Sequence, residues 1–319
     1  MKKNNIFLLI GLILVINSYI IAVNNYSSDV MTITPRYTQV ELDSMRMCFI
    51  KEGNQHDFVT YIGYSNDEEN RFMFTFYMAN MYNNSYTQFE MYEMIREFYK
   101  NIGIEINSTA SEIALSYLKR SFVQEHFSAG WEMSRLLLCG IGMTKDTIAA
   151  KEIIYKQCKK EKAGKIWLAN NINYPKWYEK DKKEREEIQE ERRMRIKYQA
   201  KLIDNLIDTT ANNPSYTQDE LNLLKDYFIE YGNQNAYTTY IKFFPDVENK
   251  AMYTFFMANT HNSAIAQYQM YCMIRDFYKS IGKDMDSTAN DIAISYLKRS
   301  AEQGYYSAEL ELSRFTQHE

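Results

Sequence analysis

Apolar residues recur at helical spacing along most of the chain, and residues 91–103 give the clearest example. Within 91–99, a set of apolar residues falls at i, i+3, i+4, i+7 and i+8, and its members are Met91, Met94, Ile95, Phe98 and Tyr99. This spacing places all of them on one face of an α-helix. Gly103 follows directly and predicts the end of that helix.

A second apolar stripe predicts another helix immediately afterwards. Its residues are Ile113, Ala114, Tyr117 and Leu118. Ser108 and Glu112 lie near its start, where we expect capping residues. Short amphipathic helices joined by short turns cannot bury themselves alone, so they must stack on neighbouring helices.

The whole pattern occurs twice, at a constant offset of 179 residues. Tyr61 recurs as Tyr240, and Gly103 recurs as Gly282. Residues 35–135 align with residues 214–314 without a gap, and about half of the aligned positions are identical. For example, STASEIALSYLKRS in the first copy returns as STANDIAISYLKRS in the second. The chain therefore carries a tandem duplication of a helical module.

A stricter pattern lies in residues 129–164. Its fixed positions are Ala129, Met133, Gly140, Gly142, Met143, Asp146, Ala150, Ile154 and Tyr155. This pattern resembles the Sel-one-like repeat, a relative of the tetratricopeptide repeat, with a further repeat beginning at Ala163. The small alanines allow two helices to approach closely, and the glycines reverse the chain between them.

The duplicated stretches resemble degenerate members of the same family, and the resemblance covers 91–170 and 270–315. Arg96 and Arg275 depart from it, because the family has a small residue at that helix crossing. The resemblance implies an all-α fold, an α-solenoid of stacked antiparallel helix pairs. Residues 35–90 and 214–269 fit the repeat poorly but also predict helices.

The predicted domain organisation has four parts. A signal peptide occupies 1–22, a first helical-repeat module 30–170, a charged connecting helix 171–213, and a second module 214–319. Within this connecting segment, residues 176–201 mix both charge signs without Gly or Pro, which is typical of a solvated helix. A basic patch facing an anionic surface is the alternative interpretation of this segment.

The N-terminus has the pattern of a secretory signal. Lys2 and Lys3 precede the short apolar run IFLLIGLILVI, and Ala22 is a candidate cleavage residue. Retention as an N-terminal anchor is the alternative. With cleavage, we expect a periplasmic or secreted bacterial protein without integral membrane association.

Composition narrows the function classes. The 319 residues include only 11 Gly and 4 Pro, which favours helices. The net charge of −4 predicts no nucleic-acid partner. Export permits disulfides, but the four cysteines show no paired spacing, so we interpret them as buried apolar residues in preference to a disulfide framework. They are Cys48, Cys139, Cys158 and Cys272.

Catalytic, cofactor and metal motifs are absent from the sequence. None of the four histidines recurs between the copies or lies at metal-ligand spacing. The sequence contains no GxSxG and no phosphate-binding loop, and GIGMTKD at 140–146 is better explained by the repeat. We therefore predict a protein that is not an enzyme and needs no cofactor.

Tyrosine and arginine recur in matching places, and both residue types anchor protein interfaces. Six of them form the predicted partner-binding set: Tyr92, Arg96, Arg135, Tyr271, Arg275 and Arg314. Shared internal packing is the alternative explanation. The predicted function is an exported adaptor or scaffold that binds a protein partner in the bacterial envelope. A narrower form of this prediction is that the chain is an immunity protein against a secreted toxin. An envelope-polymer hydrolase and a structural tether are the alternatives.

Overall fold

The computed structural model describes residues 37–65, 68–158, 161–171, 174–208, 216–243 and 249–316. The chain divides into two compact units, 1–44 and 45–319. The described part of the first unit is 37–44, which includes the start of helix α2 (Gln39–Glu52). The predicted signal peptide lies outside the described residues, and the four predicted domain boundaries remain predictions.

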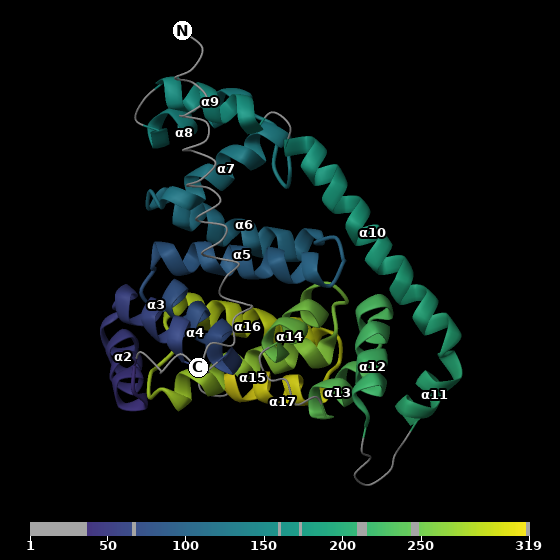
Figure 1. Cartoon of the computed structure of the whole chain (residues 1–319). Coiled ribbons are helices and arrows are strands. Elements are labelled where there is room, and N and C mark those ends of the chain that lie inside the picture. The colour runs from purple at the N-terminus through teal and green to yellow at the C-terminus, as the bar shows by residue number, and fades with distance from the viewer. Residues whose placement is uncertain are drawn as a thin grey trace. The chain divides into compact units, whose positions relative to one another are not determined.

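Every regular element in the described ranges is a helix, as the apolar periodicity predicts (Figure 1). The first copy contains α2, α3 (Gln55–Tyr64), α4 (Glu68–Met81), α5 (Ser85–Asn101), α6 (Ser108–Val123) and α7 (Phe127–Cys139). The second copy repeats them as α12 (Gln218–Tyr231), α13 (Gln234–Phe243), α14 (Lys250–Asn259), α15 (Ala264–Ser280), α16 (Ser287–Glu302) and α17 (Tyr306–Thr316).

Four helices lie between the copies in the sequence. They are α8 (Thr147–Cys158), α9 (Glu161–Asn171), α10 (Tyr174–Tyr198) and α11 (Ala200–Asp208). Neighbouring helices pack as pairs, including α5 with α6, α7 with α8, and α15 with α16. The predicted all-α fold of stacked helix pairs is therefore confirmed.

Local sequence signals set the ends of these helices. The side chain of Asn107 accepts a hydrogen bond from the Ala110 amide and caps α6, so the predicted cap Ser108 is off by one residue. Asp286 caps α16 in the same way. Gly103 ends the α5 turn with a φ of 64°, a left-handed conformation that glycine adopts without strain.

The repeat pattern at 129–158 has the predicted geometry. Gly140 and Gly142 both adopt positive φ between α7 and α8, and the Asp146 carboxylate accepts hydrogen bonds from two amides at the start of α8. Ala129 and Ala150 are completely buried. Small residues thus allow the close helix approach that the pattern predicts.

The two copies pack against each other reciprocally. Helix α4 contacts α16, its counterpart α14 contacts α6, and α4 contacts α14. The aromatic rings repeat this relation: Phe74 packs on Phe277 with centroids 5.2 Å apart, and Tyr253 packs on Phe98 at the same distance. Such reciprocal contacts are the signature of a two-fold related interface, so the duplicated modules associate as a pseudo-dimer within one chain.

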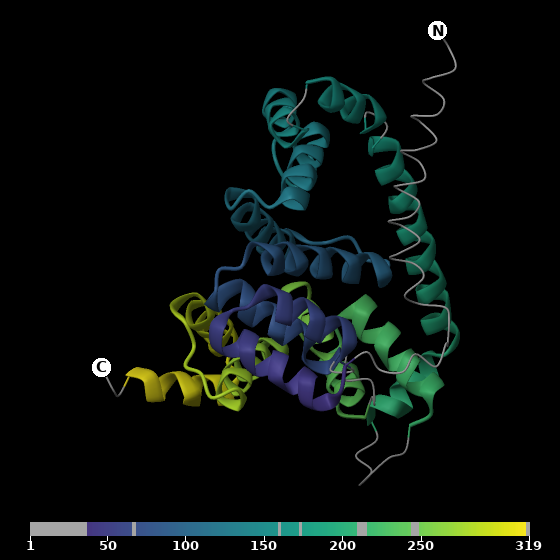
Figure 2. The same ribbon diagram turned by 60° about the vertical axis from the view of Figure 1, so that its left-hand side comes forward.

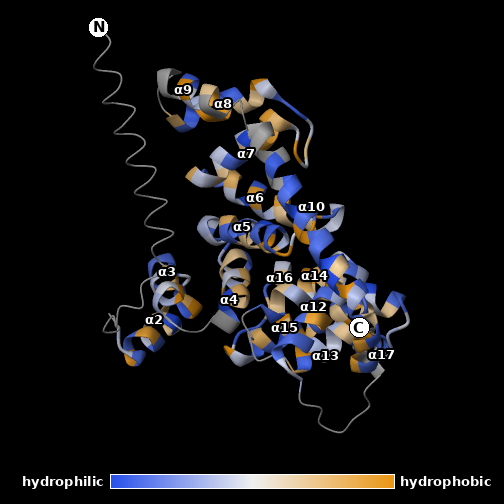
Figure 3. Cartoon of the chain, turned by 45° about the vertical axis from the view of Figure 1, so that its right-hand side comes forward, coloured by the Kyte–Doolittle hydropathy of each residue, from blue (hydrophilic) through white to orange (hydrophobic). Residues whose placement is uncertain are grey.

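Helix α10 connects the copies and packs on both of them. It runs as a single long helix (Figure 2), and its surface is mostly hydrophilic (Figure 3). Arg192 is nevertheless only 5% exposed. It donates a hydrogen bond to the carbonyl of Ile102 in the first copy and lies beside Asp226 and Glu230 of α12 in the second. The prediction that the connecting helix is solvated is therefore wrong at Arg192.

The turn after α5 offers a matched test of that contact. A Cβ added at Gly103 would lie 2.6 Å from Ile188 Cγ2 of α10, whereas one at Gly282 would meet nothing within 4 Å. The two φ angles are 64° and 66°. Replacing either glycine by alanine is expected to cost about 1 kcal/mol of unfolding free energy through backbone strain.

Gly103→Ala is expected to cost at least about 1 kcal/mol more than Gly282→Ala, because it also overpacks the α10 contact. Urea unfolding followed by circular dichroism measures both values. Equal losses in the two variants would show that α10 does not press on this turn.

Candidate functional site

The first three predicted partner-binding residues meet around one buried carboxylate, Glu132 of α7. The side chain of Glu132 is 6% exposed. The Tyr92 hydroxyl donates to Glu132 Oε1 at 2.8 Å, and Arg96 Nη1 donates to the same oxygen at 2.6 Å. Arg135 Nη1 donates to the other oxygen, Oε2, at 2.7 Å. These residues connect α5 with α7 across the helix pairs.

The other three predicted residues form an equivalent cluster around Glu311 of α17. Tyr271 and Arg275 each donate to Glu311 Oε1 at 3.0 Å. Arg314 donates to Oε2 at 3.0 Å. In both clusters the α5 or α15 arginine also lies over its tyrosine ring, 5.2 Å from the centroid. Arg96 and Arg275 therefore each pair with a carboxylate on the neighbouring helix. They do so at the helix crossing where the repeat pattern has a small residue.

The tyrosines and the arginines of these clusters differ in their exposure to solvent. Tyr92 and Tyr271 are each 1% exposed. The arginine side chains reach solvent, from 31% for Arg135 to 65% for Arg314. The tyrosines therefore position the arginines, and only the arginine edges face outward. The sequence prediction missed Glu132 and Glu311, although their identity in both copies was the signal that could have found them.

Burial shifts the acid–base behaviour of the first cluster. It raises the pKa of Tyr92, and the Glu132 carboxylate adds to that shift. Burial raises the pKa of Glu93 to about 7, and the nearby Glu132 carboxylate adds to this shift, while the positive charge of Arg96 opposes it. Glu93 corresponds to Cys272 in the second copy. This titrating acid is therefore a feature of the first copy alone.

The two clusters differ in what covers them. On α7, Phe127, Trp131 and Arg135 lie at i, i+4 and i+8, and the Trp131 ring contacts Trp167 of α9 at 4.7 Å between centroids. The equivalent stripe on α17 is Tyr306, Leu310 and Arg314. In the described ranges, α16 is the only helix that packs extensively on α17.

Exposure confirms that the α17 stripe is open. Leu310 is 43% exposed, and Tyr306 is 73% exposed against 58% for its counterpart Phe127. Ser134 of α7 is completely buried, whereas its counterpart Ser313 on α17 is exposed. We call Tyr306, Leu310 and Arg314 the α17 stripe.

Among the described residues, no group of three or more His, Cys, Asp or Glu side chains could hold a metal ion. No described helix is both long enough and apolar enough to cross a bilayer.

All four cysteines are described, and each is a free, partly exposed thiol. The interpretation of these residues as buried apolar side chains is therefore wrong in the degree of burial. They form no disulfide framework.

No protein-family model matches the chain, and no curated protein matches it. The chain is similar to a Sel1 repeat protein from Oxalobacter formigenes, at 16% identity and a TM-score of 0.25, over 85% of this chain and 88% of the other.

It is also similar to a protective antigen present in uropathogenic Escherichia coli strains that displays an SLR fold. Here the identity is 16% and the TM-score 0.26, over 86% of this chain and 55% of the other. Likeness at these TM-scores carries no argument about the function of this chain.

Proposed function

We propose that this protein is a non-enzymatic helical-repeat scaffold that binds a protein partner through the α17 stripe. The observation that carries the proposal is the contrast between two equivalent stripes. Trp131 of the α7 stripe packs on Trp167 of α9, whereas its counterpart Leu310 on α17 is 43% exposed. Repeat proteins bind partners through surfaces that stacked helices leave open.

The first copy indicates what the α17 stripe accepts. Gly130 of α7 lets α8 approach so closely that a Cβ there would lie 2.0 Å from Gln157 Nε2. Glu309 stands at the equivalent position of α17, so a helix placed there as α8 is placed on α7 would have to accommodate a longer side chain. An aromatic side chain placed on α17 as Trp167 is placed on α7 would pack on Leu310 and Tyr306.

The arginines give this surface its polar part. Arg314 completes the stripe at 65% side-chain exposure, and Arg275 lies beside it at 36%. We therefore expect a partner that presents an aromatic residue next to an acidic one. The Arg96 and Arg135 edges in the first copy form a second, more covered contact of the same kind, and Tyr92 and Tyr271 hold the arginines in place.

The setting of the interaction is part of the proposal. The N-terminal pattern supports export to the periplasm or beyond, and an adaptor in the bacterial envelope fits that location. An immunity protein that blocks a secreted toxin is a narrower form of the same function. A hydrolase or tether remains the alternative, without a specific observation in its favour.

Site-specific photocrosslinking tests the proposal. A benzophenone amino acid replaces Leu310 in the full chain, and a control carries it at the exposed Lys279 of α15. In the native host, one protein should be captured at position 310 and not at position 279. That protein is then purified for direct binding measurements. Equal capture at both positions, or none at 310, would overturn the proposal.

Binding variants provide the decisive second step. Leu310→Asp should weaken the purified complex at least about tenfold, because it places a charge in the apolar contact. Glu302→Lys, on exposed α16 surface, is the control and should bind as the unmodified chain does. Unchanged affinity of Leu310→Asp would exclude the stripe. For the immunity form, co-expression with a captured toxin should rescue growth, and Leu310→Asp should not.

A further inference from the structure

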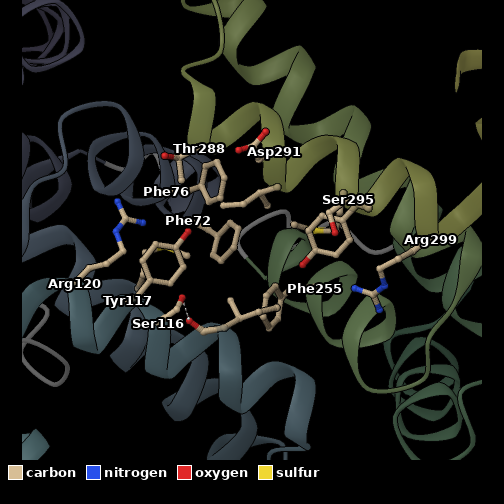
Figure 4. A pocket seen from close by; sticks show the side chains of 15 residues that line it. Phe72, Phe76, Ser116, Tyr117, Arg120, Phe255, Thr288, Asp291, Ser295 and Arg299 are labelled. Atoms are coloured by element: carbon tan, nitrogen blue, oxygen red, sulfur yellow. Dashed lines mark hydrogen bonds between the residues drawn. The ribbon is translucent and has the colours of Figure 1, made fainter. Parts of the chain in front are cut away.

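A cavity of about 430 Å³ lies between the two copies (Figure 4). Helices α4, α5 and α6 of the first copy line it together with α14, α15 and α16 of the second. Its interior is apolar, and Phe72, Phe76 and Phe255 are among the side chains that line it. Cavities of roughly 300–1,000 Å³ with mostly apolar walls and a few polar groups are typical small-molecule sites.

The lining follows the pseudo-two-fold relation between the copies. Equivalent pairs face the cavity from both sides, and they are Phe76/Phe255, Ser116/Ser295, Tyr117/Tyr296 and Arg120/Arg299. Figure 4 shows the two arginines at opposite ends with the aromatic rings between them. The cavity therefore exists only because the modules pack reciprocally, and neither module forms it alone.

Both arginines are held in fixed positions by the ends of neighbouring helices. Arg120 donates to the Ala79 carbonyl and to Asn80 Oδ1, each at 2.8 Å. Arg299 donates to the Ala258 carbonyl at 3.0 Å and to Asn259 Oδ1 at 3.1 Å. A third, longer bond runs from Nη2 of each arginine to Asn83 Oδ1 or Asn262 Oδ1 at 3.3 Å. Because arginine carries five N–H donors, the three bonds leave part of each guanidinium available.

Neither guanidinium is neutralised by an acid within the described residues. Other arginines in the described part of the chain form ion pairs within 4 Å, whereas Arg120 and Arg299 form none there. Asp291 is the one carboxylate that lines the cavity, so its charged side chains sum to +1. Tyr117 and Tyr296 each accept a hydrogen bond from an asparagine amide, which leaves their own hydroxyl protons to donate.

We propose that this cavity binds a small amphipathic carboxylate. The apolar body of the ligand packs against the phenylalanines, and its carboxylate is held by Arg120 or Arg299 in a charge-assisted hydrogen bond. Asp291 opposes anion binding and limits the affinity. This ligand site is independent of the α17 stripe and requires no partner protein.

Calorimetry on the full chain with three matched probes tests the charge preference. Decanoate, decanol and decylammonium share one apolar chain and differ in head-group charge. Decanoate is expected to bind at least about tenfold more tightly than decanol, with an affinity that falls as salt increases. Equal binding of decanol, tighter binding of decylammonium, or no decanoate binding would each overturn the proposal.

Matched variants locate the site. Arg120→Gln/Arg299→Gln should lower decanoate affinity at least tenfold, whereas Lys119→Gln/Lys298→Gln removes two exposed charges one residue away and should change nothing. Asp291→Asn should tighten binding, and Ser295→Phe should abolish it by filling the cavity. If the arginine variant fails to fold, the last two variants decide. Unchanged affinity in both would refute the site.

Discussion

Phe277→Ala is expected to lower the free energy of unfolding by about 3–5 kcal/mol, the usual cost of removing a buried phenylalanine. Phe277 is 7% exposed and packs on Phe74 and Tyr77 of the other copy. Its counterpart Phe98 packs on Tyr253 and Phe256 in the reciprocal way. Phe98→Ala is therefore expected to cost a similar amount.

Guanidinium unfolding followed by far-ultraviolet circular dichroism measures both losses. Phe315→Ala is the control, because that ring is 45% exposed and its removal should cost less than about 1 kcal/mol. Losses as small as the control value at both positions would mean that the copies do not pack as a pseudo-dimer.

Arg192→Leu is expected to cost about 3 kcal/mol. The side chains of Asp226 and Glu230 are only 8% and 5% exposed, and removal of the buried arginine leaves their charges partly uncompensated. Arg193 and Arg195 still pair with them from the exposed side, which keeps the loss at the lower end of the 3–5 kcal/mol range.

A compensating variant separates charge burial from loss of packing. Arg192→Leu/Asp226→Leu/Glu230→Leu removes the buried charges together and should recover most of the stability, since apolar replacements of a buried ion cluster are often neutral. Arg193→Leu, at 51% side-chain exposure, should cost about 1 kcal/mol or less. A triple variant as unstable as Arg192→Leu would indicate that the charges themselves do not set the cost.

The sequence predicted the site only in part. Tyr92, Arg96 and Arg135 were predicted because they recur in the second copy, and the structure brings them together around Glu132. Their convergence on Glu132 was not predicted, because a carboxylate on an amphipathic helix ordinarily faces water. Of the α17 stripe, Arg314 was predicted but Tyr306 and Leu310 were missed, since Leu310 has the same helical periodicity whether or not another helix covers it.

The sequence by itself determined the helices, their turns and the duplication. These features depend on neighbours a few residues apart: the apolar stripe of 91–99, the left-handed turn at Gly103 and the Asp146 cap are all local. Only the tertiary structure decided how the two copies meet. An apolar stripe specifies that a face is buried but not which helix buries it, so tandem stacking and reciprocal packing have the same local signature. The buried Arg192 and the cavity beside Arg120 and Arg299 both follow from that choice.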